Sequence, residues 1–328
     1  MTITSLSRRA TLAAGLATAL PWRGAQAQQY PERALRWIVA YAAGGGTDTL
    51  ARILGAALSS RIGQPVVVEN RPGAATNLGA EAAAKSAPDG YTLFSADNGT
   101  LVFNPALFRS LPYNADTDFR PIGLMARFHL VLTVKQNSAF TSARALFEAA
   151  TARAGQIDYG SPGIGSPHHL TMERLSKETG ARFNHVPYRG AAPALNDLLA
   201  GNFEAMILDL PSGAEYLRSG RVKPLAICSA ARHPDLPDVP TIQEALGLGG
   251  FQASAWQGMV VPARTPPAIA ERLTAELARA QQDRAVAEKM RSIGLEPLTG
   301  GPDEFRTLIQ AERAIWVPLI RERGIVLD

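Results

Sequence analysis

The sequence of 328 residues has little of several features that would point to a structural or functional class. It contains one cysteine, so no disulfide can form within the chain. That residue, Cys228, lies in the apolar run "PLAICSA", which predicts a buried thiol. Beyond the N-terminal segment, no apolar run is long enough to cross a membrane. These absences argue against a disulfide-stabilised scaffold and against a membrane-spanning chain.

Motifs of common catalytic and metal sites are also missing, because HExxH, GxSxG and CxxC do not occur. His168 and His169 are adjacent, so on a helix they point about 100° apart and cannot chelate one metal as an i, i+4 pair could. We therefore expect no metal and no cofactor. A Ser–His–Asp triad built from Ser161 or Ser166, His168 and Asp209 keeps an exported α/β hydrolase open as an alternative, although no spacing constrains its geometry.

Strong charge of one sign is absent once the N-terminus is set aside. The formal net charge of the chain is +4, but residues 1–27 hold three arginines and no acid, which leaves 30 basic and 29 acidic side chains. No basic block remains that would attract a polyanion. The sequence therefore predicts no nucleic-acid partner.

The first 27 residues have the pattern of an export signal. A pair, Arg8 and Arg9, precedes a short apolar run at 10–20, and an A-x-A cleavage pattern ends at Ala27. Such a run is too short to span a bilayer. We expect residues 1–27 to be a twin-arginine-like signal peptide that directs the protein to the periplasm.

The remaining residues alternate between strand-like and helix-like segments, which predicts an α/β fold with mixed or parallel sheets and flanking helices. Two extended segments, 127–134 and 251–261, flank a block of about 120 residues that has its own strand–helix pattern. We expect two lobes joined by a two-crossover hinge. Residues 28–127 and 254–328 would form domain 1, and residues 128–253 would form domain 2.

Five predicted strands end in a small-residue loop that precedes a helix. Ligands of open α/β sheets bind beyond the carboxyl ends of strands, and free N–H groups at a helix N-terminus attract anions. The glycines leave the backbone open to a ligand. The five loops are 43–48, 95–100, 160–167, 187–191 and 208–212.

The first loop, "AYAAGGGTD", lacks the GxGxxG spacing and the Lys-Ser/Thr of a P-loop, which argues against a nucleotide. An ordinary tight turn remains open for any one loop. Asp48 fits either a helix cap or a ligand contact, and Asp209, just past an apolar strand, fits either role equally. In the third loop, Ser166 followed by Pro167 predicts an N-cap and a first helical residue.

Together these stretches resemble the Bug family of periplasmic solute receptors, which are the binding proteins of tripartite tricarboxylate transporters. The resemblance covers nearly all of the sequence after the signal segment. It is carried by "YPERALRWIVAYAAGGGTDTLARIL", "GQPVVVENRPGAATNLGAEAAAKSAPDGYTL", "YGSPGIGSPHHL", "HVPYRGAAPALNDLLAGNFEAMILDLPS" and "VVPARTPPAIAERL". One departure is Ala40, which stands where the family loop usually has proline.

The resemblance implies a two-lobed periplasmic-binding-protein-like fold, no enzyme activity, and capture of a small organic acid for inner-membrane transporter subunits. The acid could be a di- or tricarboxylate, an aromatic carboxylate or an acidic amino acid. A ligand-sensing receptor for a membrane signalling system is an alternative that the same fold would serve. The ligand-binding residues implied by the loops and the resemblance are Tyr41, Ala43, Gly44, Gly45, Asp48, Thr100, Ser161, Gly165, Ser166, Tyr188, Arg189, Gly190 and Asp209.

Overall fold

The computed structural model describes residues 30–328, so the predicted signal peptide lies outside the described residues. Ten strands and eleven α-helices alternate along this part of the chain. The strands are β1 (Leu35–Val39), β2 (Val66–Asn70), β3 (Thr92–Asp97), β4 (Phe119–Lys135), β5 (Asp158–Ser161), β6 (Asn184–Pro187), β7 (Ala205–Asp209), β8 (Val222–Ile227), β9 (Ser254–Pro262) and β10 (Leu295–Pro297).

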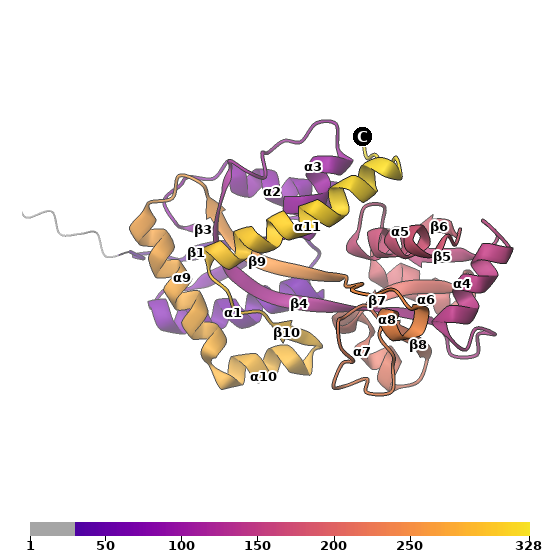
Figure 1. The fold of residues 1–328 in the computed structure, drawn as a ribbon. Coiled ribbons are helices and arrows are strands. Elements are labelled where there is room, and N and C mark those ends of the chain that lie inside the picture. Colours follow the sequence, from indigo (N-terminus) through magenta and orange to yellow (C-terminus); the bar gives the residue numbers. More distant parts are fainter. Residues whose placement is uncertain (1–29) are drawn as a thin grey trace, which may run out of the picture.

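The helices flank these strands in two lobes (Figure 1). They are α1 (Gly46–Ile62), α2 (Asn77–Ala84), α3 (Asn104–Leu107), α4 (Ala143–Ala152), α5 (Pro167–Thr179), α6 (Ala191–Ala200), α7 (Leu210–Arg218), α8 (Ile242–Leu246), α9 (Pro267–Gln282), α10 (Arg284–Ser292) and α11 (Pro302–Glu322). A one-turn 3₁₀ segment (Ala74–Thr76) and a π-helical turn (Gly99–Phe103) precede α2 and α3.

The strands of each lobe form a mixed sheet. In lobe 1, β1 pairs in parallel with β2 and β3, and β9 runs antiparallel to β3 and β4. In lobe 2, β5 pairs in parallel with β6 and β7, while β4 runs antiparallel to β7 and β8. The predicted two-lobed α/β class is confirmed. The two sheets nevertheless form one continuous hydrogen-bonded sheet, because β4 belongs to both. Its strand order is β2-β1-β3-β9-β4-β7-β5-β6.

β4 is a single strand of 17 residues that passes from lobe 1 into lobe 2 (Figure 1). Residues 119–129 pair with β9, whereas residues 130–135 pair with β7 and β8. The partners therefore change between His129 and Leu130. This change supports the predicted boundary at 127/128, and the boundary at 253/254 coincides with the start of β9. Both boundaries stay predictions.

The first part of β4 was not predicted from the sequence. Pro121 and Gly123 interrupt its alternation, and the pairing with β9 shifts register between these two residues. Proline and glycine within a strand are typical of such irregular positions, and they hide the strand from pattern reading. α7 begins at Leu210, inside the predicted loop 208–212, because Asp209 caps it and Pro211 occupies the first turn.

Cys228 has the buried position that its sequence context predicts. It is fully buried next to the hinge, where its backbone N–H donates to Leu130 and its carbonyl accepts from Ala253. Burial raises the pKa of the thiol to about 12. The thiol is therefore protonated at neutral pH and serves as a small apolar group in the core.

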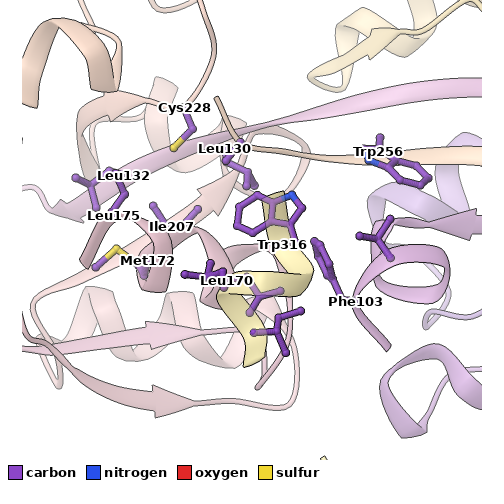
Figure 2. Close-up of a cluster of buried hydrophobic side chains, with 14 of the residues drawn as sticks. Phe103, Leu130, Leu132, Leu170, Met172, Leu175, Ile207, Cys228, Trp256 and Trp316 are labelled. Carbon is purple, nitrogen blue, oxygen red and sulfur yellow. The ribbon is translucent and has the colours of Figure 1, made fainter. Parts of the chain in front are cut away.

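The C-terminal helix α11 adds a contact between the lobes that the two-crossover expectation lacks. Its buried Trp316 ring packs edge-on against Phe103 of lobe 1, with ring centroids 5.6 Å apart. Figure 2 shows Trp316 in one apolar cluster with Phe103 and with Leu170 of α5 in lobe 2. Just beyond the helix, Arg323 forms an ion pair with Glu173 of α5 at 3.3 Å. α11 therefore touches both lobes.

Replacing Trp316 should destabilise the whole chain, because its ring fills a space shared by both lobes. We expect Trp316→Ala to lower the free energy of unfolding by about 3–5 kcal/mol, the usual cost of truncating a buried aromatic side chain. Ile315→Ala, at a neighbouring residue that is 43% exposed, is the control and should cost less than about 0.5 kcal/mol. Urea unfolding followed by circular dichroism measures both. Equal effects would show that the cluster does not join the lobes.

Candidate functional site

The first candidate loop leads from β1 into α1 and presents an open helix N-terminus. Gly45 is the N-cap and offers no side chain to cap the helix. The amides of the first turn, beginning at Gly46, therefore have no acceptor inside the helix. Residues 42–45 are exposed, and a β-carbon built on Gly44 or Gly45 would meet no side chain. α1 thus presents N–H donors and the positive end of a 17-residue helix dipole.

Asp48 is turned inward to hold this loop in shape. Its buried carboxylate accepts hydrogen bonds from the Gly44 amide at 2.9 Å, from Asn70 at 2.9 Å and from Arg52 at 2.9 Å. Burial by itself would raise the pKa of Asp48, but the bonds from Arg52, Gly44 and Asn70 lower it below its usual value. In this arrangement Asp48 positions the loop that precedes α1.

Tyr41 and Thr100, both predicted site residues, are joined by Asp97, which was not predicted. The Tyr41 hydroxyl donates to Asp97, and the Thr100 amide and hydroxyl each donate to it at 2.7 Å. Burial raises the pKa of Asp97 in spite of these bonds. The Thr100 hydroxyl also contacts that of Thr76 at 3.0 Å. These polar groups form an internal network between the first two loops.

The segment Ala74–Thr76 is a second feature that the sequence did not reveal. All three residues have positive φ (46°, 49° and 78°), a conformation that side chains other than glycine rarely adopt. Asn104 holds them through hydrogen bonds to the Ala75 carbonyl at 2.7 Å and the Asn77 side chain at 2.8 Å. Only the sequence "GAAT" with its glycine hinted at an unusual turn, and nothing in it predicts three such residues in a row.

In the loop between β5 and α5, the predicted N-cap is confirmed: the Ser166 hydroxyl accepts from the His169 amide at 3.2 Å. Many of the donors expected to face a ligand have internal partners instead. The amide of Gly163 donates to the Ser161 hydroxyl, that of Gly165 to His169 Nδ1, and that of Ser166 to the Gly163 carbonyl. The glycines therefore let this loop fold on itself, and these three amides are already used within it; a role of the loop in ligand binding stays a prediction.

Two buried or half-buried histidines contact residues of this loop. His169 and His185 stack with ring centroids 4.0 Å apart, and His185 lies 4.7 Å from the ring of Tyr159. Nε2 of His185 contacts the Ser161 hydroxyl at 2.7 Å. Burial lowers the pKa of His185 to about 4, and burial together with the charge of His185 lowers that of His169 to about 3. Both rings are therefore neutral at physiological pH.

The segment 187–190 lies directly beside the α5 loop. The amide of Tyr188 donates to the Ser161 carbonyl, and that of Gly190 donates to the Pro162 carbonyl, both at 2.9 Å. The Tyr188 hydroxyl donates to Asp197 at 2.7 Å, while Arg189 is exposed. Predicted residues from these two loops are thus brought together.

Asp209 is both the cap of α7 and the partner of His168. Oδ1 accepts from the Ser212 amide at 2.9 Å, and Oδ2 lies 3.0 Å from Nε2 of His168. Burial alone would raise the pKa of Asp209, but the bond from His168 leads the interactions that lower it. Ser161 is paired with His185 and Ser166 caps α5, so the residues considered for a triad are engaged in separate interactions.

Three helix N-termini, one from lobe 1 and two from lobe 2, converge at this point. A β-carbon on Gly46 of α1 would lie 3.1 Å from Pro211 of α7, so the two helices approach closely. His168 of α5 bonds to Asp209 at the start of α7. The pKa of the Tyr41 hydroxyl is raised well above its usual value, mainly by burial and further by the charges of Asp97 and Asp209. Asp209 of lobe 2 therefore acts on a residue of lobe 1. Such a convergence suits a small anion.

Comparison with known proteins identifies the family of the chain. The family described as "Tripartite tricarboxylate transporter family receptor" matches residues 50–325. The chain belongs to this family. Protein BugT of Bordetella pertussis is 38% identical over 302 residues, which is 92% of each chain. A protein from the tcbD–tcbE intergenic region of a Pseudomonas species is 36% identical over 323 residues, covering 98% of this chain and 96% of that one.

Solved structures of receptors give the same result. R. palustris Rpa4515 with adipate has a TM-score of 0.84 and 35% identity, covering 90% of this chain and 99% of its own. MatC from Rhodopseudomonas palustris with bound malate has a TM-score of 0.80 and 31% identity, covering 89% and 100%. The periplasmic binding protein BugD has a TM-score of 0.81 and 32% identity, covering 91% and 100%. The protein is a two-lobed receptor of this family.

Within residues 30–328 no group of three or more His, Cys, Asp or Glu side chains is arranged to hold a metal ion. Among the helices of the same residues, none has the length and apolar character needed to cross a membrane.

The neutral histidine pair makes the receptor sensitive to acid. The unfolded chain protonates His169 and His185 below about pH 6.5, whereas the folded chain does so only near pH 3 and pH 4. Stability contributed by the pair is thus complete above pH 6.5 and is lost as the pH falls toward these values. We expect a loss of up to about 1.4 kcal/mol per pH unit for each histidine between pH 6 and 5.

Urea unfolding at pH 8, 6 and 5 measures this effect. His185→Phe retains an aromatic ring for the stack but removes one titrating group, so the slope between pH 6 and 5 should fall by up to about 1.4 kcal/mol per pH unit. An unchanged slope in this variant would show that the pair does not set the acid sensitivity.

Proposed function

We propose that this protein is a periplasmic receptor that binds a small organic acid between its lobes and delivers it to the inner-membrane subunits of a tripartite tricarboxylate-type transporter. The observation that carries the proposal is the convergence of the α1, α5 and α7 N-termini from both lobes. Membership of the receptor family and the adipate and malate in the titles of two similar structures support an organic acid as the ligand.

The first carboxylate of the ligand binds at the N-terminus of α1. Its amides are the open donors, because the Gly44 amide is used by Asp48 and many amides of the α5 loop are used within that loop. Backbone amides suit this task since they carry partial positive charge and, unlike lysine or arginine, need no ordering of a long side chain. The exposed loop at 42–45 gives the ligand access.

The predicted site residues divide into two roles. Ala43, Gly44 and Gly45 form the open loop, whereas Tyr41, Asp48, Thr100, Ser161, Ser166 and Asp209 shape it or its counterpart in lobe 2 through hydrogen bonds. Gly165, Tyr188, Arg189 and Gly190 complete the edge in lobe 2.

Closure moves domain 2, proposed as residues 128–253, toward domain 1 about the two crossovers. β4 and the segment before β9 lie next to each other there, with the Ala253 amide bonded to the Cys228 carbonyl and the Cys228 amide bonded to Leu130. Because the converging helix ends belong to different lobes, a bound anion stabilises the closed arrangement. The residues bind and position a ligand, and no catalytic step is assigned to them.

A thermal-shift screen tests the proposed function. Protein stripped of ligand is heated with dicarboxylates, tricarboxylates, aromatic acids and acidic amino acids, one at a time. A ligand at 100 times its dissociation constant should add about 2.7 kcal/mol to the free energy of unfolding and raise the melting temperature. If no organic acid shifts the melting temperature, the proposal fails.

Gly45→Val tests the carboxylate position. The residue has extended backbone, and its added β-carbon would meet only the Ala42 carbonyl at 3.7 Å, so the fold tolerates the change. The side chain would cover the N-terminus of α1, and we expect at least a tenfold loss of affinity with less than about 1 kcal/mol lost in stability. Calorimetric titration with the acid found in the screen measures the affinity.

Gly249→Val is the matched control, because Gly249 is an exposed glycine with open space around it and should leave binding unchanged. Gly165 is unsuitable for this test, since its φ is +75° and a β-carbon would lie 2.5 Å from Leu107. Tight binding by Gly45→Val would show that the first loop is only a turn.

A further inference from the structure

Two buried side chains lie beside the converging helices. In each of them one polar atom is hydrogen-bonded, and the other has no partner among the described residues. They are Gln257 of β9 in lobe 1 and His168 of α5 in lobe 2. Buried polar atoms in folded proteins are nearly always hydrogen-bonded, and each exception calls for an explanation. As whole residues Gln257 is 4% exposed and His168 is 9% exposed, and the two unpartnered atoms are buried, so bulk solvent does not supply the missing bond.

Gln257 places its carboxamide at the N-terminus of α1. Its Nε2 donates to the hydroxyl of Thr47, the second residue of that helix, at 3.2 Å, and its Oε1 is unpartnered. The side chain is 4% exposed. A carboxamide can turn over with little change in shape. The Thr47 hydroxyl would then donate to Oε1, and Nε2 would be free to donate to a carboxylate beside the α1 amides.

His168 occupies the matching position in lobe 2. Its Nε2 lies 3.0 Å from Asp209 at the start of α7, and this contact fixes the ring. Nδ1 is buried and has no partner among the described residues. A neutral ring with its proton on Nε2 offers Nδ1 as an acceptor for a hydroxyl. A ring that carries a proton on both nitrogens offers Nδ1–H as a donor to a second carboxylate.

The two free atoms belong to one place in the fold. In lobe 1, Gln257 bonds to Thr47, and the neighbouring Gly46 approaches Pro211 of lobe 2. Pro211 lies two residues after Asp209, which is the partner of His168. Gln257 itself pairs with Asp97 in the sheet, and Asp97 holds Tyr41 and Thr100. A ligand held between the α1 and α5 ends can therefore meet one side chain from each lobe.

We propose that Gln257 and His168 determine ligand specificity: Gln257 binds the first carboxylate together with the α1 amides, and Nδ1 of His168 binds a second polar group at the other end of the ligand. This assignment rests on the proposed function. It narrows the ligand class to organic acids with a second hydrogen-bonding group, either a dicarboxylate or a hydroxycarboxylate, and it disfavours simple aromatic monocarboxylates.

The test compares acids of equal length on ligand-stripped full-length protein by calorimetric titration. The probes are adipate against hexanoate and malate against butyrate. We expect the wild-type protein to bind at least one diacid ten times or more tightly than its monoacid. His168→Gln keeps a polar atom where Nε2 bonds Asp209 but removes Nδ1, so the diacid preference should fall below threefold while monoacid affinity is unchanged.

Two further variants complete the design. Gln257→Met keeps the shape of the side chain and removes both polar atoms, and it should weaken diacid and monoacid binding alike by about tenfold. His168→Asn keeps a polar atom near the Nδ1 position and should retain more of the diacid preference than His168→Gln. Thr265→Val is the control, because the Thr265 hydroxyl is also buried and unpartnered but its residue lies after β9, outside the site.

The outcomes separate this inference from the proposed function. If no carboxylate binds the wild-type protein, the receptor proposal fails and this inference falls with it. If carboxylates bind but His168→Gln keeps the full diacid preference, or Gln257→Met binds as tightly as Thr265→Val, the specificity assignment alone is overturned. Circular dichroism of each variant checks that it is folded, and the Asn and Gln variants together guard against a loss caused by misfolding.

Discussion

The arrangement of this receptor depends on β4, one strand shared by two sheets. Its residues 119–129 pair in lobe 1 and its residues 130–135 pair in lobe 2. Because the strand is continuous, the end of β7 lies beside Leu130, where β4 changes partners. That register places Asp209 and the start of α7 against the α1 loop. The position of the candidate site at the lobe boundary is thus a consequence of hydrogen-bond register in a shared strand.

The negative charge of the carboxylates at this boundary is stabilised by hydrogen bonds within the protein. Three buried carboxylates surround the converging helix ends, which would repel an anionic ligand if their charge were unopposed. Asp48 accepts from Gly44, Asn70 and Arg52, Asp97 from Tyr41 and Thr100, and Asp209 from Ser212 and His168. Each of these carboxylates therefore holds a loop in place, while the amides at the positive N-terminal end of α1 stay free to bind a ligand. A scaffold ordered before the ligand arrives loses less entropy on binding.

The C-terminal helix modifies the simple two-crossover hinge. α11 packs its Trp316 against Phe103 in lobe 1 and meets α5 of lobe 2 through Glu173 and Lys177. If lobe 2 moves, either α5 slides along α11 or the C-terminal end of α11 moves together with lobe 2. Of the polar contacts at the far end, the Lys177–Glu322 ion pair is exposed and the Arg323–Glu173 ion pair is partly exposed. Ion pairs near the surface are weak, so they allow movement while the aromatic cluster retains the packing.

The sequence by itself determined the α/β class, the positions of most strands and helices, the five loops and the family, because periodicity, caps and glycine runs are local. It predicted the cap at Ser166 from its neighbours alone, whereas for Asp209 it left a cap and a ligand contact equally open. Tertiary structure decided what those loops do. Asp97, Gln257 and His168 gained importance only through partners far along the chain, such as Tyr41, Thr47 and Asp209. The first part of β4 was hidden by Pro121 and Gly123, since a bulge is stabilised by the pairing strand β9 and leaves no periodic pattern of its own.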